Sequence, residues 1–264
     1  MVTILPLTER AIDQSLPDSG RGAKFLKVTL DTPMGSELNH SEIAAMRRSY
    51  SETGMGTLSD NPFDVFSRWL KEAHENIMIV EANAMVLTTV DHEGVLSTRT
   101  VLLKDVSEGG FTFFTHYSSR KGRAIHSQPN VALLFPWYAM ERQVSVTGIA
   151  QKVSRSESEK YFASRPWSHQ IGAWASRQSA TLSSREELEN RWKSAAEKWP
   201  EGSIVPTPSE WGGYLVLPET IEFWQGRYSR LHDRVQYRRD VQNMDTGMEV
   251  STNENEWEIT RHYP

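Results

Sequence analysis

From Ala84 almost to the end of the chain, segments recur in which hydrophobic residues alternate with polar ones, and this period of two limits the possible folds most strongly. Alternation of this kind is typical of half-buried β-strands. Turn residues such as DHEG separate the first segments, as in antiparallel hairpins. The predicted strands are AMVLTTV, VLSTRTVLLK, GFTFFTHY, VALLFPWY, RQVSVTGIAQKVS, GGYLVLP, TIEFWQG and HDRVQYRR, with WEITRHYP closing the chain.

One of these segments also indicates which face is packed. In RQVSVTGIAQKVS, Val144 and Val146 alternate with Gln143, Ser145 and Thr147. Successive side chains of a strand point to opposite faces. One face of this strand is therefore expected to be packed, and the other to be wet or lined by a ligand.

Helix signals interrupt the strands. Helices are predicted over residues 39–50, 62–76, 118–128, 156–165 and 183–199. The first has Asn39 and Glu42 spaced as a capping-box variant, and the last begins with overlapping Ser-x-x-Glu boxes. The second carries an apolar stripe of Phe63, Phe66, Leu70 and Ala73, which we expect in the core. Strands and helices together predict an α+β fold whose sheet is mostly antiparallel and barrel-like.

The domain organisation is simple. The 264 residues suffice for one large domain with a genuine core. Residues 1–38 mix Pro, Gly, Ser and charge without periodicity, so we predict a flexible N-terminal arm. Residues 39–264 then form a single domain, in which the acidic stretch 241–255 is expected to be a mobile loop.

Composition excludes several classes of function. The formal net charge of −5 argues against a nucleic-acid partner. The absence of cysteine excludes disulfides, thiolate nucleophiles and cysteine metal ligands, and no motif predicts a metal site. No apolar run is long enough to span a bilayer, and MVTILPLTER does not resemble a secretory signal. We therefore expect a cytoplasmic protein without a membrane partner.

Common catalytic motifs are missing, among them G-x-G-x-x-G after a strand, the Walker loop, H-E-x-x-H and G-x-S-x-G. The remaining candidates are cations near strand ends. Arg99 and Lys104 are five residues apart, so a regular strand would point them to opposite faces and two different anions. Exposed charges at a strand edge are the alternative.

Three further groups are candidates for binding anions or rings. Arg120 and Lys121 begin a predicted helix, where free N–H groups favour phosphate, although a solvated helix start is about as plausible. Tyr161 and Arg165 are four residues apart on a helix and could grip one phosphate or form a surface stack. The third group lies in one short strand–turn–strand region and consists of Trp224, Arg230, His232 and Arg234. If the chain stays extended there, the side chains at positions 230, 232 and 234 share one face.

Seven motifs then occur in one order between Arg99 and Arg234. They are R-x-V-L-L-K, F-F-T-x-x-x-S-R-K, L-F-x-W-x-x-x-x-R-Q-V, Y-F-x-S-R-P, I-G-A-W-A-S-x-Q-S, W-G-G-Y and E-F-W-Q-G-x-x-x-R-L-H-D-R. This series resembles the pyridoxamine 5'-phosphate oxidase family, and the segment with Arg47 and Tyr50 extends the match. The resemblance implies a split-barrel flavoprotein and a homodimer with two FMN sites at the interface, each built from both chains.

The resemblance also implies roles for individual residues. Contacts to FMN fall to Arg99, Phe114, Thr115, Arg120, Lys121, Gln143, Gln178, Ser179, Trp224 and Arg234. Contacts to the substrate phosphate fall to Lys104, Tyr161, Arg165 and His169. Arg230 and His232 would lie over the substrate ring as catalytic residues, with Arg47 and Tyr50 closing as a lid. Two positions depart from the family pattern: Phe114 replaces a common tyrosine, and His169 replaces a serine, whose contact the adjacent Ser168 could take over.

The implied reaction is oxidation of pyridoxamine or pyridoxine 5'-phosphate to pyridoxal 5'-phosphate. FMN would accept a hydride from the 4' carbon, and oxygen would reoxidise it to give hydrogen peroxide. His232 is one candidate for a proton acceptor. Two other interpretations remain: a split-barrel module that only carries or senses flavin or pyridoxal phosphate, and a nicotinamide-dependent reductase of the same fold. Tyr161 with Arg165, and Arg230 with His232, argue against the reductase.

Overall fold

The computed structural model describes residues 40–46, 49–107, 109–240 and 257–264. Contacts within the chain divide it into Met1–Arg47 and Arg48–Pro264. The described part of the first unit contains helix α1 (His40–Ala45), so the helix predicted over 39–50 is shorter than expected. The predicted arm, its cap residue Asn39, the lid residue Arg47 and the acidic stretch 241–255 lie outside the described residues.

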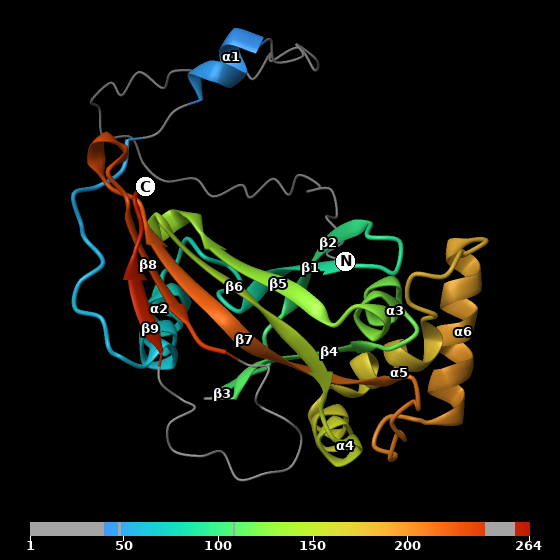
Figure 1. Cartoon of the computed structure of the whole chain (residues 1–264). Coiled ribbons are helices and arrows are strands. Elements are labelled where there is room, and N and C mark those ends of the chain that lie inside the picture. Colours follow the sequence, from blue (N-terminus) through green and yellow to red (C-terminus); the bar gives the residue numbers. More distant parts are fainter. Residues whose placement is uncertain (1–39, 47–48, 108, 241–256) are drawn as a thin grey trace, which may run out of the picture. The chain divides into compact units, whose positions relative to one another are not determined.

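The second unit is built on one nine-stranded sheet in which all pairings are antiparallel. The main path runs β2-β1-β5-β6-β7-β4-β3, while β8 pairs with β7 and β9 pairs with β8. Figure 1 shows this sheet curling around long central strands, so the predicted split-barrel class is confirmed. The strands are β1 (Ala84–Val90), β2 (Leu96–Leu102), β3 (Asp105–Ser107), β4 (Gly110–His116), β5 (Asn130–Trp137), β6 (Arg142–Lys152), β7 (Trp211–Gln225), β8 (Asp233–Arg238) and β9 (Glu258–Arg261).

Two strand predictions need correction. GGYLVLP and TIEFWQG form one continuous strand, β7, because Pro218 lies where the pairing with β6 shifts register between Thr147 and Gly148. A proline is tolerated at a bulge because no ladder N–H is needed there. A Cβ at Gly148 would lie 2.1 Å from the carbonyl oxygen of Leu217, so this close approach requires glycine. The short strand β3, which pairs only three residues with β4, was not predicted.

Four of the five α-helices in the described part of this unit begin at side-chain caps. The five are α2 (Pro62–Glu75), α3 (Arg120–Ser127), α4 (Arg155–Ser164), α5 (Trp167–Ala175) and α6 (Arg185–Lys198). Asn61 caps α2, Ser119 caps α3 and Ser184 caps α6, each accepting a backbone N–H. Of the two overlapping boxes predicted for α6, Ser184 with Glu187 supplies the cap.

Helix α5 is the helix that the sequence pattern missed. It follows Pro166 without a side-chain cap, and its residues WSHQIGAWA are mostly apolar. Tertiary contacts stabilise it instead. The amide of buried Gln170 donates to the carbonyl oxygens of Ala163 and Arg165, and Ile171 packs in a cluster with Phe162 and Trp211.

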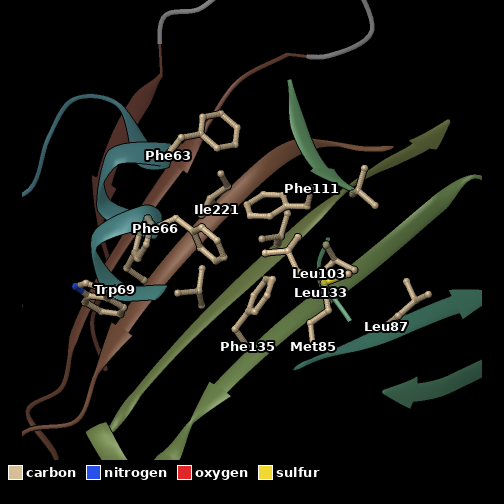
Figure 2. Packing of buried hydrophobic residues seen from close by; sticks show 14 of the residues in the cluster. Phe63, Phe66, Trp69, Met85, Leu87, Leu103, Phe111, Leu133, Phe135 and Ile221 are labelled. Atoms are coloured by element: carbon tan, nitrogen blue, oxygen red, sulfur yellow. The ribbon is translucent and has the colours of Figure 1, made fainter. Parts of the chain in front are cut away.

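The main core lies between α2 and the sheet. Figure 2 shows Phe63, Phe66 and Trp69 projecting from α2 toward the strands that carry Phe111, Phe135 and Ile221. Phe66 is fully buried and makes edge-to-face contacts with Phe111 and Phe135, with both pairs of ring centroids 4.9 Å apart. The predicted stripe is confirmed at Phe63, Phe66 and Ala73, while Leu70 is only partly buried.

Strand β7 connects this core to a second cluster. Near its end, Phe223 packs against Trp69 of α2, and at its start Trp211 packs against Phe162 of α4. Figure 1 accordingly shows α2 beside β8 and β9, with α4, α5 and α6 gathered at the other end of β7. No helix in the described residues is long and apolar enough to cross a bilayer.

Candidate functional site

A cavity of about 1080 Å³ opens between β2, the end of β4, the start of α3 and the segment from α4 to Ser179. Its walls come from elements far apart in the sequence, which the sheet brings together. Eleven predicted site residues line it: Arg99, Lys104, Phe114, Thr115, Arg120, Lys121, Tyr161, Arg165, His169, Gln178 and Ser179.

The electrostatic character of this cavity is strongly positive. Five of its lining residues are lysine or arginine, and none of the described residues that line it is Asp or Glu. The chain as a whole carries a formal charge of −5, so this concentration of positive charge is local. Cations that lack acidic partners favour an anionic ligand.

Neighbouring polar groups hold Arg99 and Lys121 in place. Arg99 donates from Nη1 to Oγ1 of Thr89 at 2.9 Å and from Nη2 to Oγ of Ser97 at 2.5 Å. Lys121 is almost fully buried, and its Nζ donates to Oε1 of Gln178 at 2.9 Å. Burial lowers the pKa of Lys121 to about 8, and the positive charge of Arg99 contributes to this shift. Burial likewise lowers the pKa of Arg99, with a further contribution from Arg120.

Arg165 has a buried hydrogen-bond donor without a partner. Its Nη1 atom is enclosed and makes no hydrogen bond to any described residue. The guanidinium carbon lies 4.9 Å from the ring centroid of Trp211, which fixes the side chain by a cation–π contact. Burial lowers the pKa of Arg165, and Tyr161 opposes that shift. Because a buried unsatisfied donor is costly, this nitrogen fits an anionic ligand that would accept a hydrogen bond from it.

The relation of Tyr161 to Arg165 differs from the prediction. Helix α4 ends at Ser164, and Arg165 is extended with φ −74° and ψ 150°, as expected for a residue before proline. The two side chains therefore do not share a helix face, although both line the cavity. Tyr161 instead stacks on Phe114, with ring centroids 4.0 Å apart, so Phe114 supplies a ring surface.

The prediction that Arg99 and Lys104 face opposite sides rested on a premise that the structure contradicts. It assumed one regular strand, but β2 ends at Leu102. The chain then turns, since the N–H of Leu103 donates to Asn83 and that of Lys104 donates to Thr112. Both cations consequently line the same cavity.

His116 lines the cavity too and was missed by sequence reasoning. Burial lowers the pKa of its imidazole, the charges of Lys121 and Arg165 lower it further, and Glu210 opposes them. The residue lies inside the F-F-T-x-x-x-S-R-K motif, but at an unspecified position, so the motif gave no signal. At position 169, His169 and the adjacent Ser168 both line the cavity, so each remains available for an anion.

A second group of predicted residues lies outside this cavity. Tyr50, Trp224 and His232 contact one another, with ring centroids 4.7 Å apart for Trp224 and His232 and 5.4 Å apart for Tyr50 and His232. The N–H of Arg227 donates to Nδ1 of His232 at 3.0 Å. A neutral His232 therefore carries its proton on Nε2. Burial lowers the pKa of His232, and the charge of Arg230 contributes.

The remaining predicted residues flank this aromatic group. Gln143 is opposite Trp224 in the pairing of β6 with β7, and Arg234 forms an ion pair with Glu222 at 2.9 Å. The assumption of an extended chain through 230, 232 and 234 was wrong. Tyr228–Arg230 is a 3₁₀ turn in which Ser229 and Arg230 have φ values of 57° and 64°, and β8 begins only at Asp233.

Comparison with known proteins gives matches over most of the chain. The family model described as pyridoxamine 5'-phosphate oxidase matches residues 70–197, and that of the pyridoxine 5'-phosphate oxidase C-terminal dimerisation region matches residues 211–264. A pyridoxine/pyridoxamine 5'-phosphate oxidase of Nocardioides sp. is 49% identical over 76% of this chain and 94% of the relative. The oxidase of that name from Thermobifida fusca is 44% identical over 86% of this chain and 100% of the relative.

Solved structures with the same fold were also found. PhzG from Burkholderia lata, in complex with tetrahydrophenazine-1-carboxylic acid, is 28% identical with a TM-score of 0.69, covering 80% of this chain and 96% of that one. An FMN-binding protein from Nostoc punctiforme, described as related to pyridoxamine 5'-phosphate oxidase, is 16% identical with a TM-score of 0.58. That match covers 79% of this chain and 100% of the other, and at this identity it bears on the fold alone.

Proposed function

Because the chain belongs to the pyridoxamine 5'-phosphate oxidase family, we propose that it is an FMN-dependent oxidase that makes pyridoxal 5'-phosphate. Pyridoxamine 5'-phosphate, water and oxygen would give pyridoxal 5'-phosphate, ammonia and hydrogen peroxide. Pyridoxine 5'-phosphate and oxygen would give the same aldehyde and peroxide. Oxygen is the electron acceptor in both reactions.

The cavity with five cations and no acidic lining residue among those described is the observation that carries this proposal. FMN and the proposed substrates each bear a phosphate, so a cavity that holds both must neutralise several negative charges. The unpartnered Nη1 of Arg165 and the buried Nζ of Lys121 fit this requirement. The stacked rings of Phe114 and Tyr161 in the wall suit planar ligands.

We assign the two ligands to different parts of the predicted set. FMN would be held by Arg99, Phe114, Thr115, Arg120, Lys121, Gln143, Gln178, Ser179, Trp224 and Arg234. The substrate would be held by Arg47, Tyr50, Lys104, Tyr161, Arg165, His169, Arg230 and His232. Arg47 enters only through the sequence, since it lies outside the described residues.

When bound, FMN would supply the two-electron acceptor. The residues of the chain would bind, orient and neutralise the ligands. Arg165 and Lys104 would hold the substrate phosphate through charge-assisted hydrogen bonds. Because the N–H of Arg227 occupies Nδ1 of His232, the neutral imidazole would offer an Nε2–H donor to the substrate rather than a base.

We also propose a homodimer with FMN at the interface. The match of residues 211–264 to a dimerisation region supports this assembly. The predicted site residues also fall into two separate groups, which supports the same assembly. Tyr50, Trp224 and His232 contact one another but do not line the cavity that contains Arg99 and Arg165. A second chain would bring such a group to the cavity of its partner.

An aerobic assay with pyridoxamine 5'-phosphate, a reduced nicotinamide and tetrahydrophenazine-1-carboxylic acid as separate substrates tests this function. The purified protein, supplied with FMN, should form pyridoxal 5'-phosphate and hydrogen peroxide in equal amounts from pyridoxamine 5'-phosphate. A carrier or sensor would bind flavin without forming either product. A reductase would oxidise a reduced nicotinamide instead. Tetrahydrophenazine-1-carboxylic acid is the comparison substrate, and preference for it would assign the chain to chemistry other than that proposed.

A further inference from the structure

Glu141 ties two distant segments of the chain together beside the aromatic group of Tyr50, Trp224 and His232. Both the backbone N–H and the Oγ of Ser51 donate to Oε2 of Glu141, each at 2.8 Å. The two residues are 90 positions apart. We call this pair of hydrogen bonds the Ser51–Glu141 clip. A carboxylate that accepts two such bonds forms stronger contacts than a neutral acceptor would.

Backbone hydrogen bonds extend the clip to the segment after β7. The carbonyl oxygen of Glu141 accepts from the N–H of Gly226 at 2.7 Å, and that of Ser51 accepts from the N–H of Tyr228 at 3.0 Å. A Cβ at Gly226 would lie 2.9 Å from Cδ1 of Tyr50 and 3.2 Å from Cβ of Glu141. The three segments are therefore packed so closely that position 226 has no room for a side chain.

The backbone of Glu141 is in the left-handed region, with φ 57° and ψ 33°. A non-glycine residue adopts this conformation at a cost in free energy, and it persists where the surroundings determine it. Glycine at this position would relieve the strain but remove the carboxylate. The hydrogen bonds to Ser51 supply a reason for glutamate here.

Ser51 directly follows Tyr50, so the clip acts on the aromatic group. The ring of Tyr50 packs edge-on against Trp224 and His232, with centroids 5.8 Å and 5.4 Å apart. The resemblance to the family suggested that Tyr50 closes on the substrate as a lid. In the structure, the contacts of Ser51 place Tyr50 beside His232, where its ring forms one wall of the aromatic group.

We propose that Glu141 is a positioning residue that fixes Tyr50 against His232 and Trp224 before the substrate binds. The inference rests on the proposed function and deepens it, because it assigns to Glu141 the task of preorganising the substrate site. A preorganised wall reduces the entropy that is lost on binding. Loss of the clip should therefore weaken substrate binding more than it slows the chemical step.

Four variants test this role: Glu141→Ala, Glu141→Gln, Ser51→Ala and Ser59→Ala. In Glu141→Ala, we expect KM for pyridoxamine 5'-phosphate to rise about 10-fold, with kcat and the Kd of FMN changed less than about threefold. Ser51→Ala keeps only the bond from the backbone N–H, and Glu141→Gln can keep both bonds but accepts them on a neutral oxygen. Both variants should fall between Glu141→Ala and the unmodified protein. Ser59→Ala is the matched control, because Ser59 is another serine whose hydroxyl donates to a carboxylate, that of Asp64.

Amide hydrogen exchange in the FMN-free protein separates this inference from the proposed function. Residues 49–55 should exchange at least about 10-fold faster in Glu141→Ala than in Ser59→Ala, whatever the substrate proves to be. If the unmodified protein does not oxidise pyridoxamine 5'-phosphate, the proposed function fails, and exchange still tests the clip. Normal exchange in Glu141→Ala overturns the inference. Faster exchange with unchanged KM in a protein that turns over would also overturn it, because Glu141 would then be only structural.

Discussion

The Nζ atom of Lys121 donates a hydrogen bond to Oε1 of Gln178 at 2.9 Å, inside a cavity that no described acidic residue lines. A second bond from Nζ, of 3.2 Å, reaches Oγ1 of Thr115, which itself donates to Gln178. A third bond from Nζ, of 3.5 Å, reaches Oγ of Ser119, so all three of these partners of the ammonium are neutral. Desolvation of the site and repulsion by Arg99 both disfavour the positive charge of Lys121, and together they lower its pKa to about 8.

This lowered pKa predicts that FMN binds more weakly at alkaline pH. Below about pH 8 Lys121 is already protonated in the free protein, so affinity changes little with its titration. Above pH 8 Lys121 is mostly neutral in the free protein. A bound phosphate favours the ammonium form, so FMN binding must then be accompanied by protonation of Lys121. The Kd of FMN should therefore rise with pH above 8, by up to about 10-fold per unit. Fluorescence titration of FMN between pH 6 and 10 measures this slope.

Lys121→Arg is the control for the pH experiment. Arginine stays charged throughout this range, so the slope above pH 8 should disappear while binding at neutral pH is retained. A slope that survives in Lys121→Arg would assign the titration to another group.

Arg165→Ala is expected to weaken substrate binding selectively. The variant removes a charge-assisted partner of the substrate phosphate, so KM for pyridoxamine 5'-phosphate should rise about 100-fold while FMN stays bound. Steady-state kinetics and the flavin absorbance of the purified protein measure the two effects. Arg185→Ala, at an arginine paired with Glu189 on the exposed face of α6, is the control. Loss of FMN equal to the loss of substrate binding would refute the assignment of separate phosphate positions.

Arg230→Ala should reduce turnover more than flavin content, and it should change the titration of His232. The charge of Arg230 lowers the pKa of His232, so its removal should raise that pKa and keep the imidazole protonated to a higher pH. NMR titration of His232 and the pH profile of kcat/KM test this. Arg238→Ala, at an exposed arginine near the end of β8, is the control. Unchanged kinetics and an unchanged His232 titration in Arg230→Ala would remove Arg230 from the site.

Phe66→Ala should destabilise the fold by about 3–5 kcal/mol, because it leaves a cavity among aromatic rings. Phe66 is fully buried between α2 and the sheet, whereas Ile77 just after α2 is 96% exposed. Ile77→Ala should change the free energy of unfolding by less than about 0.5 kcal/mol. Urea denaturation compares the two, and similar losses would contradict the core described for α2.

Sequence reasoning predicted the elements that local signals define. Alternation marked the strands, and the Ser-x-x-Glu box at Ser184 marked the start of a helix that the structure contains. Helix α5 was missed because it has no cap and follows Pro166, and contacts made by Gln170 and Ile171 stabilise it. Such contacts join residues from different segments of the chain, which a pattern within one segment cannot reveal.

The candidate site shows the same limit. Ordered motifs selected residues that the fold does bring together, such as Arg99 and Arg165 in one cavity. The geometry within the motifs was less predictable. The turn through Ser229 and Arg230 requires positive φ at two residues that are not glycine, and no propensity suggests it. Lys104 reaches the cavity because β2 stops at Leu102, which depends on how the next residues pair with Asn83 and Thr112.

The most direct test of the proposed function is an anaerobic flavin spectrum during a single turnover. The protein is loaded with FMN, freed of oxygen and mixed with one equivalent of pyridoxamine 5'-phosphate. We expect the flavin absorbance to bleach as one equivalent of pyridoxal 5'-phosphate forms, and to return with release of peroxide when oxygen is admitted. A flavin spectrum that stays oxidised with both pyridoxamine and pyridoxine 5'-phosphate would contradict the proposed function.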